Sequence, residues 1–147
     1  MSNRIAINRL TKLKNRLNDV DYDDFNMEHW AEYIVNGKPA CGTSACALGW
    51  ATTVPSLRRA GMRLMLRKSM NGFQKSKIFV GIKGKHYTRL IPNKESLKTA
   101  QEIFRIDERQ AIHIFLESLN DKGMLGIENT IKRIDSVIRQ LKEEDNG

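Results

Sequence analysis

The sequence has no long apolar run, and this absence excludes a membrane-spanning helix. No stretch approaches the roughly eighteen apolar residues that such a helix needs, and no apolar signal-peptide segment follows the first few residues. Two cysteines are too few for a disulfide framework, and a reducing compartment would keep both as thiols. We therefore predict a cytoplasmic protein without a membrane partner, in which residues 1–147 form a single domain and residues 143–147 form a frayed tail.

Several motifs with known chemistry are also missing. Cys41 and Cys46 lie five residues apart and the three histidines are scattered, a pattern that matches no zinc site. There is no Walker-type loop, dinucleotide fingerprint or paired-carboxylate signature, so the sequence indicates no cofactor. A catalytic cysteine would need His86 or His113 as its base, and the spacing departs from that of papain-like enzymes. We predict that the protein is not an enzyme.

Positive charge is abundant, and it is concentrated in one part of the chain. The formal net charge is +8, yet residues 56–98 hold twelve Lys or Arg and a single acid, Glu95, so the remaining residues sum to −3. Such a run can be simply a solvated face. However, like charges repel one another and a fold gains nothing from crowding them. An acidic or phosphorylated partner would explain the concentration.

Hydrophobic periodicity predicts a mostly helical α+β fold with about six helices and one β-hairpin near residues 78–91. The expected hairpin pairs residues 78–82 with residues 86–91 through a loop in which Gly84 takes a positive φ. The expected helices cover residues 3–18, 26–36, 41–51 and 57–70, a segment capped by Asn93, a segment capped by Asp107, and a last segment with an apolar stripe from Ile127 to Leu141.

The residues Cys41-Gly42-Thr43-Ser44, at the start of the helix that we expect to end at Ala51, predict an anion site. Beyond Ser44 the segment is apolar almost all round, which is typical of a buried helix. Free backbone N–H groups at a helix start attract anions, Gly42 would allow a close approach, and the hydroxyls of Thr43 and Ser44 could add donors. The alternative is that Thr43 or Ser44 only caps the helix, while Cys41 and Cys46 fill small spaces in the core.

Two short motifs carry a resemblance to known proteins. Phe25-x-Met27-x-x-Trp30, followed by Cys41-Gly42-Thr43-x-x-Cys46-x-x-Gly49-Trp50-Ala51, is similar to a motif pair in a family of small uncharacterised phage and bacterial proteins. The similarity covers the first part of the chain well and the rest loosely. It implies a phage-type accessory protein that acts in the host cytoplasm, and it implies no mechanism and no catalytic residues.

These observations lead us to predict non-catalytic capture of a phosphate-bearing ligand, most simply a nucleotide. Arg holds phosphate through bidentate hydrogen bonds, and Lys supplies a point charge. In a phage accessory protein, such a pocket would sequester a host signalling nucleotide as an anti-defence measure. The predicted ligand-binding residues are Gly42, Thr43, Ser44, Arg58, Arg59, Arg63, Arg67, Lys83, Lys85, Tyr87 and Arg89.

Two other functions would use the same charge. The basic segment 56–98, with Tyr87 among its cations, could bind DNA or RNA. It could also dock an acidic host protein as an inhibitor. Cations gathered in a pocket would favour a nucleotide, whereas cations on a convex face would favour a nucleic acid or an acidic protein.

Overall fold

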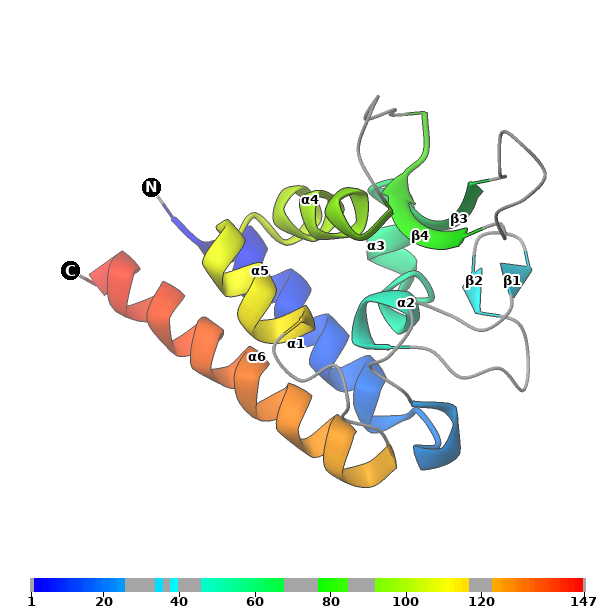
Figure 1. Cartoon of the computed structure of the whole chain (residues 1–147). Coiled ribbons are helices and arrows are strands. Elements are labelled where there is room, and N and C mark those ends of the chain that lie inside the picture. The colour runs from blue at the N-terminus through cyan, green and yellow to red at the C-terminus, as the bar shows by residue number, and fades with distance from the viewer. Residues whose placement is uncertain are drawn as a thin grey trace.

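The computed structural model describes residues 2–25, 34–35, 38–39, 46–67, 77–84, 92–116 and 123–146, of which residues 34–35, 38–39, 66–67, 77–78 and 92–94 are described by their backbone alone. These residues form a mostly helical α+β domain with an antiparallel two-stranded hairpin, as the periodicity predicts (Figure 1). The elements in chain order are α1 (Arg4–Asn18), the 3-10 helix η1 (Tyr22–Asp24), β1 (Ile34–Val35), β2 (Lys38–Pro39), α2 (Ala47–Ala51), α3 (Pro55–Arg59), β3 (Met62–Arg67), β4 (Lys77–Ile82), α4 (Pro92–Phe104), α5 (Glu108–Phe115) and α6 (Gly123–Asn146).

The core forms around α1, which packs against α2, α4 and α6. Leu10, Leu13 and Leu17 recur at helical spacing and are fully buried, so one face of α1 is entirely apolar. The 24-residue α6 runs beside α1 and buries the predicted stripe at Ile127, Ile134, Ile138 and Leu141 (Figure 1). No helix in the described part of the chain is both long enough and apolar enough to cross a membrane.

The prediction of a helix over residues 57–70 is wrong. Helix α3 ends at Arg59, the chain turns at Gly61 with φ +104°, and β3 follows at once. Glycine takes this backbone conformation without the steric cost that other residues meet. Along β3 the buried residues Met62 and Leu64 alternate with the half-buried Arg63, the period of a strand with one face on the core. The spacing from Leu57 to Leu64 fits a helix equally well, which explains the error.

The hairpin pairs β4 with β3, from Met62 opposite Ile82 to Arg67 opposite Lys77. The predicted strand at residues 78–82 is therefore confirmed, and its partner is the segment that we predicted as a helix. Residues 86–91, the partner expected from the sequence, lie outside the described residues. Helix α4 packs against β4 and brings the hairpin onto the core (Figure 1).

Three predicted helix boundaries also need correction. Ile34–Val35 pairs with Lys38–Pro39 as a short antiparallel ladder, so the helix expected over 26–36 is wrong at residues 34–35, because β-branched residues favour strands. Residues 26–33 of that prediction lie outside the described residues. Helix α2 begins at Ala47 and Cys46 is its extended N-cap, so the helix expected over 41–51 does not run through Cys46. Helix α4 begins at Pro92, whose fixed φ suits the first helical position, so Asn93 lies inside the helix.

The C-terminal residues 143–146 are helical rather than frayed. Asn3 holds them, because its backbone N–H donates to both carboxylate oxygens of Asp145, at 2.9 and 3.0 Å. The Asn3 side-chain amide donates to the Leu141 carbonyl and to a carboxylate oxygen of Glu144, each at 3.1 Å. These bonds join the start of α1 to the last turns of α6.

Candidate functional site

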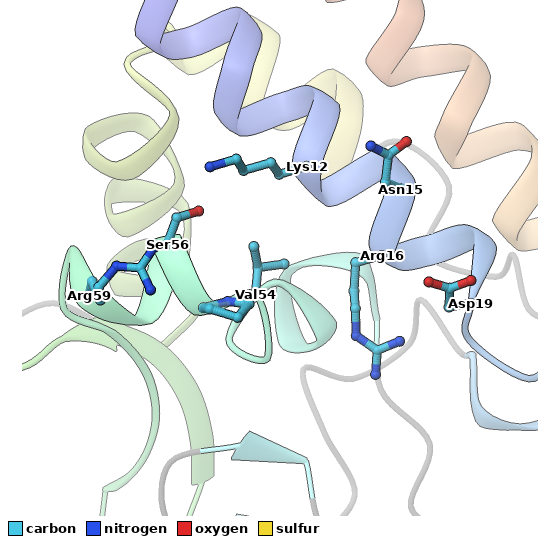
Figure 2. Close-up of a pocket in the computed structure, with 8 residues that line it drawn as sticks. Lys12, Asn15, Arg16, Asp19, Val54, Ser56 and Arg59 are labelled. Carbon is cyan, nitrogen blue, oxygen red and sulfur yellow. The ribbon is translucent and has the colours of Figure 1, made fainter.

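A pocket of about 350 Å³ opens between α1 and α3, beside Val54 at the start of α3 (Figure 2). Its size falls within the range of small-molecule sites, which runs from roughly 300 to 1,000 Å³. The pocket is lined by Lys12, Asn15, Arg16, Asp19, Val54, Pro55, Ser56 and Arg59.

Helix α1 supplies one wall of the pocket through four polar side chains. Lys12, Asn15, Arg16 and Asp19 follow one another at intervals of three, one and three residues, a spacing that places all four on one face of the helix. This face lies beside the apolar face that α1 buries in the core. Helix α1 therefore presents a polar row to the pocket while its leucines fix the helix in place.

Helix α3 and its N-cap Val54 supply the other wall. Val54 is the N-cap of α3, and its carbonyl accepts from the backbone N–H groups of Leu57 and Arg58 at 3.0 and 2.9 Å. Pro55 occupies the first turn of the helix, and its fixed φ favours this tight entry. The turn brings the apolar surface of Val54 and Pro55 next to the hydroxyl of Ser56.

Arg16 is held in place by contacts on the α2 side. Its Nε donates to Thr53 Oγ1 at 2.7 Å, and its Cζ lies 5.2 Å from the centre of the Trp50 ring. The indole N–H of Trp50 donates in turn to the Asp24 carbonyl at 3.0 Å, so the ring is fixed as well. A cation over the face of an indole is attracted by the ring electrons. Arg16 therefore contributes a positioned positive charge.

Ser56 has a hydroxyl that is buried and has no hydrogen-bond partner among the described residues. Lys12 extends from α1 toward the α3 side of the pocket, in the direction of Ser56, and Arg59 lies one turn further along α3 (Figure 2). Lys12 and Arg59 are exposed, and neither makes an ion pair within the described part of the chain, where the ion pair is Lys14–Asp135. Among the described lining residues Asp19 is the one acid, so their three cations give this part of the pocket a net positive charge.

Arg58 and Arg63, both predicted to bind the ligand, are instead engaged with the backbone. Arg58 Nη1 donates to the Thr52 carbonyl at 3.2 Å, and Arg63 Nη1 donates to the carbonyls of Arg58 and Met62 at 2.7 and 2.8 Å. Burial, followed by the nearby charge of Arg63, lowers the pKa of Arg58. These two guanidinium groups brace the turn from α3 into β3, and the pocket lining does not include them.

The remaining predicted site residues divide into three groups. Arg59 is the one that the structure places in the pocket. Lys83 is exposed in the turn after β4, where its backbone N–H donates to the Gly61 carbonyl at 2.7 Å, and Arg67 ends β3 with only its backbone described. The other predicted residues lie outside the described part of the chain: Gly42, Thr43, Ser44, Lys85, Tyr87 and Arg89.

Cys46, one of the two candidate nucleophiles weighed from the sequence, is fully buried. Burial raises the pKa of its thiol to about 12, although hydrogen bonds from backbone N–H groups, including that of Gly49, lower it. The thiol is thus protonated at neutral pH and serves as the N-cap of α2, accepting from Gly49 N at 3.5 Å. Cys41 and His86 lie outside the described residues.

Most of the pocket is formed by residues that the sequence did not indicate as a site. They are Lys12, Asn15, Arg16, Asp19 and Ser56. Their signal in the sequence is the helical spacing of the four residues on α1. That signal is weak, because the polar face of any amphipathic helix shows similar spacing. Only the position of α3 opposite this face distinguishes the row from an ordinary solvated surface.

No protein-family model matches the chain, and comparisons with curated proteins and with solved structures give no match either.

Proposed function

We propose that the protein binds a small phosphate-bearing ligand, a nucleotide, in the pocket between α1 and α3, without chemically changing it. The observation that carries this proposal is the combination, at one end of a concave site, of Ser56 with two cations that make no ion pair within the described part of the chain. A buried hydroxyl without a hydrogen-bond partner costs free energy, so its retention is most simply explained by a partner that arrives with the ligand.

The end of the pocket near Ser56 suits a phosphate group. Lys12 provides an ammonium point charge, and Arg59 provides a planar guanidinium that can donate two parallel hydrogen bonds to phosphate oxygens. The Ser56 hydroxyl can donate a third. Both cations are exposed and neither is paired with an acid among the described residues, so binding would replace water around them.

The remainder of the lining suits the sugar and base of a nucleotide. Val54 and Pro55 offer an apolar surface on which a ring can rest. The Asp19 carboxylate is an acceptor for ribose hydroxyls or for an amino group of a base, and Asn15 both donates and accepts. The mixture of an apolar floor with a few polar groups is typical of sites for small organic ligands.

Calorimetry against a panel of ligands tests this proposal. The panel contains adenosine and guanosine mono-, di- and triphosphates, cyclic mononucleotides, inorganic phosphate and a short DNA duplex. Lys12→Ala, Ser56→Ala and Arg59→Ala should each weaken binding of the same nucleotide about 10- to 100-fold, the loss expected for one charge-assisted hydrogen bond. Lys132→Ala and Arg139→Ala remove exposed cations of α6 and should leave the affinity unchanged.

Two results would contradict the proposal. The first is that no nucleotide in the panel binds, which would disprove the proposal. Binding of the duplex alone, with a steep dependence on salt and no sensitivity to the three pocket variants, would instead support a nucleic-acid-binding function of the basic segment 56–98.

A further inference from the structure

A second surface lies where η1 meets the start of α6, and three large apolar side chains are exposed on it. The exposed fractions are 56% for Tyr22, 51% for Met124 and 64% for Leu125. The two elements are in contact, because Gly123 N donates to the Phe25 carbonyl at 3.0 Å and a Cβ on Gly123 would lie 3.9 Å from the Tyr22 carbonyl. We call Tyr22, Met124 and Leu125 the η1–α6 patch.

Single exposed apolar residues are ordinary, but a cluster of them marks an interaction surface. Ile5 is the only other large apolar side chain with such exposure among the described residues, and it lies on the first turns of α1, by the end of α6 remote from the patch. Tyr and Met are enriched in protein interfaces, and Met adapts its shape to different partners. The composition of the patch therefore fits a contact with another polypeptide.

Carboxylates lie on the same two elements as the η1–α6 patch, or directly before them. Asp21 and Asp23 are exposed on η1 or directly before it, Asp24 is half-buried, and Glu128 is exposed one turn after Met124 on α6. Arg16, a nearby cation, is already engaged with Thr53 and Trp50. A chain with a formal net charge of +8 thus carries exposed acids on the two elements that hold these exposed apolar residues.

This arrangement argues against two other occupants. A two-fold contact with a second copy would press these carboxylates against their counterparts, and a head-to-tail contact would find no second apolar cluster on the described surface to pack against. A metal ion is not favoured either, because no group of three or more His, Cys, Asp or Glu in the described residues could hold one. An occupant that is itself both apolar and basic satisfies the apolar residues and the carboxylates together.

We propose that the η1–α6 patch docks a basic amphipathic helix of another protein. The apolar face of that helix would cover Tyr22, Met124 and Leu125, and its Lys or Arg side chains would face Asp21, Asp23 and Glu128. Helices that bind in this way place apolar anchors on one side and charges at the edges. The docking surface shares no residue with the α1–α3 pocket, so either proposal can be disproved without affecting the other.

Fluorescence anisotropy with designed peptides tests the inference. The probe is a labelled 18-residue peptide of Leu and Lys arranged as an amphipathic helix, and the comparison peptide has the same composition in an order that gives no apolar face. We expect the first peptide to bind at least about tenfold more tightly than the second. Leu125→Ser and the pair Asp21→Asn with Asp23→Asn should each weaken its binding at least about fivefold.

Matched variants separate docking from general charge attraction or unfolding. Ile5→Ser removes an exposed apolar side chain elsewhere, and the pair Glu108→Gln with Glu143→Gln removes two exposed acids elsewhere, so both should bind the peptide like the original protein. Equal binding of the two peptides, or no effect of Leu125→Ser, would overturn the inference. Concentration-dependent dimerisation that Leu125→Ser abolishes would also overturn it, because the occupant would then be a second copy.

Discussion

The Ser96 hydroxyl accepts a hydrogen bond from the backbone N–H of Val80 at 2.8 Å. A side chain of α4 thus provides the acceptor that a neighbouring strand would otherwise supply. One turn further along α4, Thr99 Oγ1 donates to the Val80 carbonyl at 3.1 Å. Both hydroxyls are buried, and together they satisfy both main-chain polar groups of one residue on β4. This contact secures the hairpin to the helical core.

Replacement of Ser96 by Ala should destabilise the protein by about 1–3 kcal/mol, because the N–H of Val80 would be left buried without an acceptor. Unfolding in urea, followed by circular dichroism, measures the change. Lys98→Ala, an exposed change on the same helix, should have almost no effect. If Ser96→Ala unfolds at the same urea concentration as the original protein, water has replaced the hydroxyl and the contact is dispensable.

Arg16 and Thr53 should be energetically coupled, because the 2.7 Å hydrogen bond between them involves a charged donor. We expect Arg16→Met and Thr53→Val to destabilise the protein individually, and their combination to cost about 1 kcal/mol less than the sum. Thr53→Ser keeps the hydroxyl and should retain most of the stability. Strict additivity in the double-mutant cycle would show that the hydrogen bond contributes nothing in solution.

Ser56→Ala should weaken ligand binding without lowering the stability of the protein. Loss of a buried hydroxyl without a partner should leave the free energy of unfolding unchanged or raise it by about 1 kcal/mol, while nucleotide binding weakens. Thermal unfolding without ligand, together with calorimetry, measures the two effects. A marked drop in melting temperature would mean that the hydroxyl has a structural partner in solution, and the main support for the pocket would be lost.

The thiol of Cys46 should react very slowly with iodoacetamide in the folded protein. A Cys41→Ala background isolates it, and denaturation should restore the ordinary rate of a free thiol. Because the thiolate is the reactive form, both burial and a pKa near 12 suppress the reaction. Modification at the same rate in the folded and the denatured protein would contradict the buried position.

The same pKa predicts a loss of stability in alkaline solution. The unfolded chain releases the thiol proton near the ordinary value of 9.0, whereas the folded protein retains it until about 12. Stability from this group is therefore complete below pH 9 and declines as the pH rises toward 12. In the Cys41→Ala background, Cys46→Ala should lessen this decline, and the other titrating groups are common to both proteins.

Regular helices with strong local signals were predictable from the sequence. The apolar spacing identifies α1 and α6, and Asp107 is the predicted N-cap of α5, where its side chain accepts from Gln110 N at 2.8 Å while Gln110 Oε1 accepts from Asp107 N. Such signals act over a few residues, so the sequence carries them directly. The α+β class followed from the same reasoning.

The segment 57–70 and the pocket could not be predicted in this way. At β3 the apolar residues fit two periods, and the choice depends on β4, which lies further along the chain. The pocket depends on how α3 meets α1, a relationship that no local pattern records. Among the predicted cations, Arg59 faces the pocket while Arg58 and Arg63 brace a turn, because side-chain direction in this tight segment follows its backbone.

The closure of α6 onto α1 also has a consequence for the order of folding. Lys14 and Asp135, which form an ion pair at 2.8 Å, are 121 residues apart in the chain, and Asn3 and Asp145 are 142 apart. Contacts between such distant segments form late, because closing a very large loop costs conformational entropy. During synthesis, the leucine face of α1 is therefore fully covered only after α6 has been made. A nascent chain that has not yet reached α6 exposes this face and is the form most dependent on chaperones.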